Sequence, residues 1–420
     1  MKRRMRVLLP LAAVLIQAMA LLPARADEVE MFIQDSKFCD KQIQFKGTSA
    51  VADGPYSHLE VHNGVLAPAY ARACPSGSGL MTFLGTGERS GIEALLYRNA
   101  ARHFGTTDVP MSHLELIQAD GDLVAPDRRG RNSFVNHVPL FVSAQAVGYN
   151  LANCPVPALN VRSQVLSAIY TGLVTRWDDP LIAGDNPGLA SCDRDILVAK
   201  RADFSGSTLA FKDYLSKRNP QWSYYKQPAQ NQNWPTVTNR CPAYGDVAMA
   251  RCILTTQDSI GYLPFRTAKN YRVNVASLDS VASAVQPDPA ARFVRPSAQG
   301  CTDAASSSVI PPPIRSQRAL FYQTPQVNPT TLDWNSVSLS DAPLGYPMCA
   351  LAYGLIYQNI QTAYFGQSYS VGAGRTSIDY LWTALKEDAQ SRLAVYDYGR
   401  LPPNLVDVAR AGLETVRYQS

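Results

Sequence analysis

Residues 200–208 read Lys-Arg-Ala-Asp-Phe-Ser-Gly-Ser-Thr, and the interpretation of the whole chain starts from this stretch. It places a guanidinium, a carboxylate and several small hydroxyl and amide donors before a predicted helix, whose apolar stripe contains Leu209, Phe211, Tyr214 and Leu215. The first N–H groups of a helix have no partner within it, and the helix dipole favours anions there. The stretch therefore predicts an oxyanion site, with an N-capping Ser or Asp beside a surface arginine as the simpler alternative.

The N-terminus is typical of an exported protein. Basic residues within the first six positions precede an apolar run from Val7 to Leu22, and Ala24-Arg25-Ala26 has the small-x-small pattern of a signal-peptidase site. Cleavage after Ala26 would place the mature chain in the periplasm or outside the cell. A retained membrane anchor is the alternative, but the apolar run is short for a span and contains Pro10 and Gln17.

The charge of the chain gives no reason to expect a polyanionic partner. The 420 residues contain 39 Lys and Arg against 34 Asp and Glu, a net charge of +5. The first 26 residues contain five of the basic residues and none of the acidic ones, so the mature chain is neutral. Neither nucleic acid nor an anionic membrane is therefore expected, and any anion must bind at a local site.

All eight cysteines follow the predicted cleavage site, which indicates disulfides in an oxidising compartment. No two of them form a Cys-x-x-Cys pair and the five histidines are scattered, so no metal is expected. The loops from Cys154 to Cys192 and from Cys241 to Cys252 suit disulfides. Eight cysteines allow about 105 pairings, however, and the sequence does not choose among them.

Strand-like and helix-like segments alternate along the mature chain, which is typical of α/β proteins. Apolar runs at Leu80–Leu84 and Val138–Tyr149 predict strands, while Gly91–Arg102 and Ser163–Thr171 predict helices. Pro- and Ser-rich stretches at Ala304–Pro313 and Gln323–Thr331 predict loops, and the sequence between them and on to Leu344 has the least readable pattern. The mature chain is long enough for two or three domains.

Four motifs, in order along the chain, resemble the periplasmic phosphate-binding proteins of bacterial phosphate ABC transporters. Arg201-Ala-Asp203-Phe-Ser205-Gly206-Ser207-Thr is similar to their Arg-x-Asp-x-Ser-Gly-Thr signature. The others are Phe104-Gly-Thr-Thr-Asp108-Val-Pro110, Trp177-Asp-Asp-Pro180 followed by Asn186-Pro187-Gly188, and Ser259-Ile-Gly261-Tyr262. Their shared order and spacing across residues 45–263 argue against chance similarity.

The resemblance implies an α/β fold of the two-lobed periplasmic-binding-protein clamshell, similar to type II, with the ligand in the cleft between lobes. Residues 1–26 would be the signal peptide, 27–137 plus 347–420 lobe I, and 138–346 lobe II. It further implies a receptor without cofactor or covalent chemistry that captures inorganic phosphate and closes by a hinge motion. The membrane permease of an ABC transporter would recognise the closed form, and such receptors usually work as monomers.

Eight residues are expected at the phosphate site on this resemblance. They are Ser49, Ser90, Asp108, Arg201, Asp203, Ser205, Gly206 and Ser207. The Arg201 guanidinium, oriented by Asp203, would donate to two oxygens, and residues 205–207 would add hydroxyl and amide donors. Asp108 would repel an anion that has no proton to donate, which keeps protonated phosphate and rejects sulfate. A turn or capping role for Asp108 is the alternative.

Two loops depart from the family pattern. Gly47-Thr48-Ser49-Ala50 matches the first loop only loosely, although Ser49 could offer a hydroxyl. The second loop, Gly87-Glu88-Arg89-Ser90-Gly91, places Glu88 where the family has a ligand serine. A second carboxylate would weaken phosphate binding unless it points outward or pairs with Arg89, and Ser90 could supply the hydroxyl instead. A solvated Glu88 is the simplest alternative.

Other functions of the same scaffold remain open. The chain could be a secreted phosphatase-like or adhesin-like protein, or a clamshell for a related oxyanion such as a phosphonate. A Ser-His-Asp hydrolase is disfavoured because Ser205 does not lie in a Gly-x-Ser-x-Gly turn. His103 and His137 are expected to be lobe or hinge residues rather than bases.

Overall fold

The computed structural model describes residues 49–74, 79–120, 133–154, 156–226, 233–280, 293–308, 334–364 and 367–417. The predicted signal peptide lies outside these residues, as does 309–333, the larger part of the segment 304–344 that was hard to interpret.

Within the described residues, ten strands form one mixed sheet. Its order is β2-β1-β3-β12-β4-β8-β6-β7, with β9 and β13 also paired to β4. The strands are β1 (Ala50–Asp53), β2 (Met81–Phe83), β3 (Phe104–Thr107), β4 (Val135–Asn150), β6 (Leu197–Arg201), β7 (Cys241–Ala243), β8 (Ser259–Pro264), β9 (Asn274–Val275), β12 (Cys349–Tyr357) and β13 (Tyr398–Gly399). A smaller sheet contains β5 (Asn160–Val161), β10 (Ser277–Asp279) and β11 (Phe293–Val294).

The large sheet consists of two parallel groups joined by antiparallel strands. β1 pairs in parallel with β2 and β3, and β6 pairs in parallel with β7 and β8. Between these groups, β12 runs antiparallel to β3 and β4, and β4 runs antiparallel to β8. Each group therefore presents the carboxyl ends of its strands at one edge, where ligands of α/β proteins bind.

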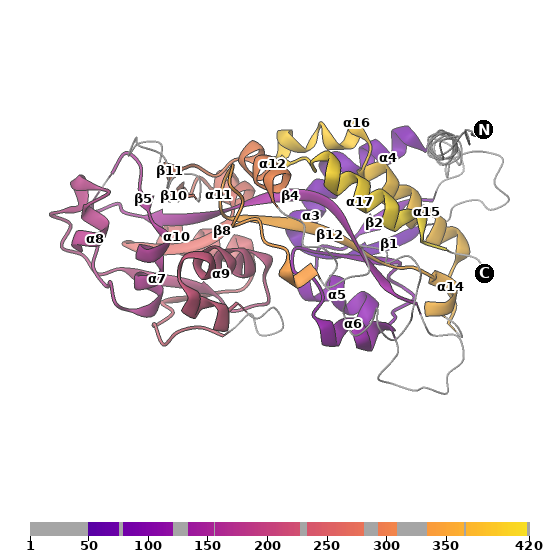
Figure 1. Cartoon of the computed structure of the whole chain (residues 1–420), viewed down its shortest axis with the longest axis horizontal. Helices are drawn as coiled ribbons and strands as arrows, with labels where there is room; N and C mark the ends of the chain where they lie inside the picture. The colour runs from indigo at the N-terminus through magenta and orange to yellow at the C-terminus, as the bar shows by residue number, and fades with distance from the viewer. Residues whose placement is uncertain are drawn as a thin grey trace, which may run out of the picture.

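The long strand β4 belongs to both halves of the molecule. The first half is built around β1, β2 and β3, and the second half around β6, β7 and β8. Its residues 135–144 pair with β12, and its residues 145–150 pair with β8. All of its residues except Asn150 are buried, which is typical of a strand covered on both faces. Figure 1 shows β4 passing through the middle of the molecule. The predicted strand Val138–Tyr149 is confirmed and is longer at both ends, so the expected lobe boundary after residue 137 falls inside β4.

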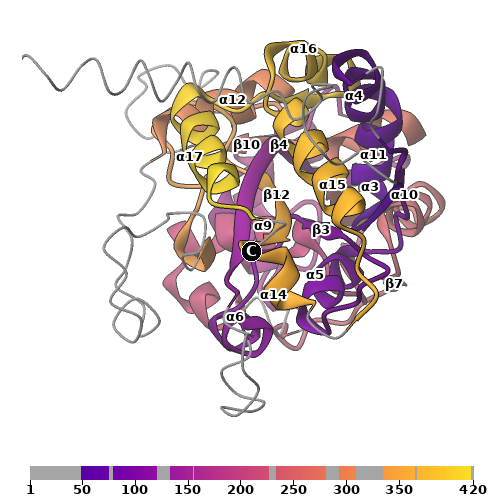
Figure 2. The same ribbon diagram turned by 90° about the vertical axis from the view of Figure 1, so that its right-hand side faces the viewer.

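In the first half, helices cover both faces of the sheet. They are α3 (Tyr56–Val61), α4 (Ala67–Ala73), α5 (Glu88–Leu96), α6 (His113–Asp120), α14 (Ile360–Ala363), α15 (Val371–Ala384), α16 (Glu387–Gln390) and α17 (Pro403–Glu414), with a π-helical turn at His62–Leu66. Figure 2 shows α15, α16 and α17 on one side of β3, β4 and β12, and α5 and α6 on the other. The predicted helix Gly91–Arg102 corresponds to α5, which begins and ends earlier than expected.

The other α-helices of the described residues belong to the second half. They are α7 (Ser163–Thr171), α8 (Pro180–Ala183), α9 (Gly206–Arg218), α10 (Asp246–Thr255), α11 (Phe265–Tyr271) and α12 (Ala298–Ser307). The predicted helix Ser163–Thr171 is confirmed residue for residue, and it ends at Gly172, whose φ of +79° suits glycine. None of the helices in the described part of the chain has both the length and the apolar character needed to span a bilayer.

Two glycines bring α5 against β3. A Cβ atom at Gly91 would overlap the carbonyl oxygen of Thr106, and one at Gly105 would overlap that of Gly91. Only glycine permits the two backbones to approach so closely. As a result Glu88, the first residue of α5, lies beside the end of β3.

The cysteines of the described residues form disulfides. The expected bridges Cys154–Cys192 and Cys241–Cys252 are both present, and a third joins Cys301 of α12 to Cys349 of β12. Cys74 is also disulfide-bonded. These bridges agree with the oxidising compartment that the cysteine count predicts.

Candidate functional site

A cavity of about 290 Å³ lies where strands of both halves end. It is lined by residues 55–57 after β1, 85–88 after β2, Asp108 after β3, five residues from Arg201 to Ser207, and 244–246 after β7. Loops and helix N-termini converge at the carboxyl ends of parallel strands, which makes this edge the usual ligand site of open α/β sheets. The cavity is the candidate binding site.

The start of α9 forms one part of this site. Ser205 is its N-cap in an extended conformation, and the helix begins at Gly206, as the sequence predicts. The aromatic ring of Phe211 stacks on Tyr262 of β8, with ring centroids 4.6 Å apart. The Tyr262 hydroxyl also lies 3.0 Å from Thr208 Oγ1 and accepts a 3.0 Å hydrogen bond from the Arg201 amide. Tyr262 thus fixes both α9 and Arg201.

Arg201, the last residue of β6, is 5% exposed and lies between two carboxylates. Its Nε and Nη2 each donate a 2.6 Å hydrogen bond to Asp203, and Nη1 donates to Asp246. Burial alone would lower the pKa of Arg201, but the charges of Asp246 and Asp203 raise it above its usual value. The expected orientation of Arg201 by Asp203 is present. Asp246, at the start of α10, is an additional partner whose only sequence signal is an acidic residue opening a helix.

Asp108 lies opposite, after β3, and is held by a histidine that the sequence analysis did not single out. Asp108 Oδ1 is 2.9 Å from His58 Nε2, and His58 Nδ1 is 2.8 Å from Thr106 Oγ1. Burial lowers the pKa of His58, but the charge of Asp108 and the hydrogen bond to it raise the pKa above its usual value. No motif around His58 indicates this role.

Glu88 occupies the anion position at the start of α9. Its Oε1 accepts a 3.2 Å hydrogen bond from the Gly206 amide, and its Oε2 accepts one of 2.8 Å from the Asp108 amide. Thr107 Oγ1 lies 2.9 Å from the same Oε2. Burial, followed by the charge of Asp108, raises the pKa of Glu88 to about 8.

The sequence-based alternatives for Glu88 are therefore wrong. Its side chain does not point outward, because it is only 7% exposed and lines the cavity. It does not pair with Arg89, which forms ion pairs with Glu93 and Glu115 instead. The helix geometry explains this, because consecutive residues of α5 point in different directions.

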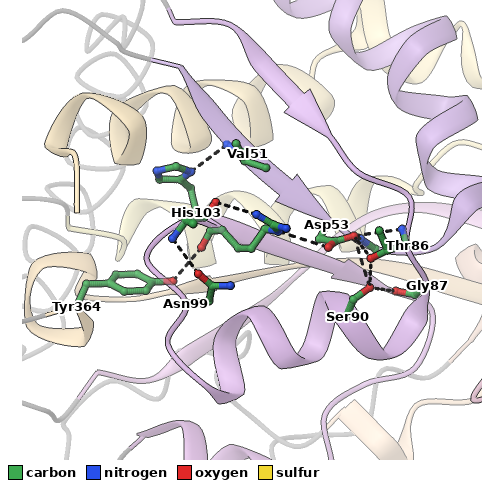
Figure 3. Close-up of polar contacts among 11 residues, drawn as sticks. Val51, Asp53, Thr86, Gly87, Ser90, Asn99, His103 and Tyr364 are labelled. Carbon is green, nitrogen blue, oxygen red and sulfur yellow. Dashed lines mark hydrogen bonds and ion pairs between the residues drawn. The ribbon is translucent and has the colours of Figure 1, made fainter. Parts of the chain in front are cut away.

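Two expected site residues, Ser49 and Ser90, do not line the cavity. Ser49 is exposed and precedes β1, whereas the cavity lies at the other end of that strand, beside Ser57. The Ser90 hydroxyl donates to the Gly87 carbonyl at 2.8 Å and lies 2.6 Å from Thr86 Oγ1, which itself bonds Asp53 (Figure 3). The other expected residues lie at the cavity or, in the case of Gly206, bonded to Glu88 beside it.

His103 and His137 each accept a hydrogen bond from a backbone amide. His103 Nδ1 accepts a 2.9 Å hydrogen bond from the Val51 amide (Figure 3), and His137 Nε2 accepts one of 3.1 Å from the Met111 amide. Neither histidine lines the cavity. Among the described residues, no group of three or more His, Cys, Asp and Glu side chains is arranged to hold a metal ion.

The fold and the cavity define a two-lobed α/β binding protein of the clamshell type, with a ligand site between the two halves. The chain matches the family described as PBP superfamily domain over residues 39–297, and it belongs to that family.

Curated relatives and solved structures agree with this class. The phosphate-binding protein PstS of Pasteurella multocida is 29% identical over 170 residues, which cover 40% of this chain and 46% of that protein. The chain spans about half the length of the first curated relatives that it matches. A phosphate-binding protein of Mycobacterium bovis is 23% identical over 84% of this chain and 85% of its own. The crystal structure of a phosphate-binding protein from Stenotrophomonas maltophilia shares the fold, with a TM-score of 0.59, 16% identity, and coverage of 87% and 93%.

Proposed function

We propose that this chain is an exported receptor that captures inorganic phosphate and delivers it to the membrane permease of an ABC importer. The observation that supports this most directly is Arg201, a buried cation beside the N-terminus of α9 in a cavity shared by both halves. Curated relatives named as phosphate-binding proteins support the same ligand.

The proposed contacts follow from the donors around the cavity. The bonds of Arg201 to Asp203 and Asp246 use three of its five N–H groups, so two are left for the oxygens of a phosphate. Ser205 and Ser57 of α3 line the same cavity and would offer hydroxyls, Ser57 in place of Ser49, whereas Ser207, whose hydroxyl donates to Gln145, would offer its amide. Asp108, oriented by His58, would accept a hydrogen from a protonated phosphate and repel sulfate.

The signal peptide, the lobe boundaries and the monomeric state are also part of the proposal. We retain cleavage after Ala26, a lobe I of 27–137 plus 347–420 and a lobe II of 138–346, with β4 and β12 as the strands along which the lobes meet. The mature protein would act as a monomer in the periplasm, where the predicted leader would deliver it.

A receptor without covalent chemistry fits this cavity better than a hydrolase. Both ring nitrogens of His58 already bond Asp108 and Thr106, so neither is left to activate a serine. The Ser207 hydroxyl donates a 2.7 Å hydrogen bond to Gln145 Oε1 of β4 rather than to a base. Release of phosphate from a phosphomonoester by the purified protein, with or without divalent metal, would contradict this part of the proposal.

Titration calorimetry of the mature protein tests the function directly. Phosphate should bind at one site per chain, and sulfate should not compete. Tight sulfate binding with no response to phosphate would overturn the assignment, and tight binding of a phosphonate in preference to phosphate would replace it with the related-oxyanion function.

A further inference from the structure

Glu88 already occupies donors that an oxyanion would use. The Gly206 amide at the start of α9 and the Asp108 amide after β3 both donate to its carboxyl group, so Glu88 links the two halves of the molecule. A Cβ at position 206 would overlap Asp108 and approach Glu88 Oε1, so the close approach depends on glycine. A phosphate that enters must share this place with Glu88.

The hydrogen bonds of Thr107 allow Glu88 to be a neutral acid. Thr107 has one hydroxyl hydrogen, and its Oγ1 lies 2.8 Å from the Val109 carbonyl oxygen and 2.9 Å from Glu88 Oε2. If the hydroxyl donates to Val109, the hydrogen between Thr107 and Glu88 must come from Glu88. The same contacts that suit a carboxylate therefore also suit a carboxylic acid.

The charges around the cavity favour the neutral form. Facing Glu88 are Asp108 from the end of β3 and His58 from α3, and on the opposite side lie Arg201, Asp203 and Asp246. Even with His58 protonated, the acids of this group outnumber the bases by two. Because a phosphate brings further negative charge, the complex is most stable if one acid keeps a proton.

We propose that Glu88 is that acid, and that its hydrogen, which points to Thr107 in the ligand-free site, turns to bound phosphate in place of the hydroxyl donor that a serine would supply. This inference rests on the proposed function and adds a determinant of specificity to it. The phosphate complex of the wild type then holds one proton, on Glu88, that the complex of a variant with an uncharged residue at position 88 does not have.

Two further observations support the assignment. Burial raises the pKa of Glu88 to about 8, so the neutral acid is present at neutral pH and is lost in alkaline solution. Arg89, the nearest cation along the chain, is paired with Glu93 and Glu115 and does not neutralise Glu88.

The test measures phosphate binding to the mature protein and to Glu88→Gln as a function of pH. The glutamine has the same size and cannot ionise, and the ionisation of phosphate itself cancels in the comparison. Above the pKa of Glu88, the affinity of the wild type should fall about tenfold per pH unit relative to Glu88→Gln. Calorimetry in buffers of different ionisation enthalpy should show about one additional proton taken up by the wild type there, and no difference at mildly acidic pH.

Controls separate this inference from the proposed function. Glu93→Gln, on the same helix but paired with Arg89 outside the cavity, should keep the pH profile of the wild type. Glu88→Ser provides the same comparison if Glu88→Gln does not fold. Parallel pH profiles and equal proton uptake in wild type and Glu88 variants would overturn the role of Glu88, even if binding depends on Arg201. Absence of phosphate binding by every variant at all pH values would overturn the proposed function itself.

Discussion

The two sides of the cavity balance charge in opposite ways. On the Arg201 side, which consists of Arg201, Asp203 and Asp246, one cation is held by two carboxylates. On the Glu88 side, which consists of Glu88, Asp108 and His58, two acids meet one histidine. In the proposed complex the Arg201 side attracts an anion, whereas on the Glu88 side the Asp108 carboxylate admits only an anion that arrives with a hydrogen to share, and the neutral Glu88 donates one. Affinity and selectivity would then come from different lobes.

Removal of Arg201 should have the largest effect. Arg201→Ala should weaken phosphate binding by at least about 100-fold, because a buried cation is lost and two carboxylates are left without their partner. Titration calorimetry measures the loss, and Arg194→Ala, at an exposed position, is the matched control. An affinity within a few-fold of the wild type would show that the anion does not bind on the Arg201 side.

Neutralisation of Asp108 should change selectivity. Asp108→Asn removes a charge that repels fully ionised anions, so sulfate affinity should rise by about tenfold or more while the preference for phosphate falls. Competition between sulfate and phosphate in the same calorimetric assay measures the ratio. If sulfate remains excluded, Asp108 is not the residue that rejects it.

The stability of the ligand-free protein should depend on Glu88 in a defined pH window. Its pKa is about 8 in the folded chain against an ordinary value of 4.5, so folding favours the protonated form. This contribution is complete below the ordinary pKa and is lost as the pH rises through about 8. Thermal unfolding should therefore show that the wild type loses stability relative to Glu88→Gln across this window. Parallel melting curves in the two proteins would argue that Glu88 is ionised throughout.

The smallest effects are expected at the two serines that lie outside the cavity. Ser49→Ala and Ser90→Ala should change phosphate affinity by less than about twofold, and Ser90→Ala should cost about 1 kcal/mol of stability through its lost hydrogen bonds. Ser57→Ala, at the cavity, should weaken binding by roughly fivefold. If Ser49→Ala weakened phosphate binding more than Ser57→Ala, Ser49 rather than Ser57 would be the serine that contacts phosphate.

The Arg201 side could be predicted from the sequence because it is mostly local. Arg201 and Asp203 are two residues apart, and the helix they precede has a readable apolar stripe. The helix Ser163–Thr171 was predictable for the same reason, since its pattern lies within one segment.

Asp108 was predicted, but its contacts with His58 and Glu88 could not be, because they join residues that are distant in sequence. His58, Glu88 and Asp108 come from α3, α5 and the end of β3, and their meeting depends on glycine contacts between backbones. The error at Ser49 has a related cause. The composition of a loop of small residues does not show at which end of a short strand the ligand lies. Only the carboxyl end of β1 faces the cavity, and Ser49 precedes the strand.

The shared strand β4 has a consequence for the folding and unfolding of the protein. Because the same strand supplies hydrogen bonds to β12 in one half and to β8 in the other, neither half retains a complete sheet without it. A chain divided at residue 137 would split this ladder, so the lobes are not independent folding units. We therefore expect the two lobes to unfold together, so that a destabilising substitution in either lobe lowers the stability of both.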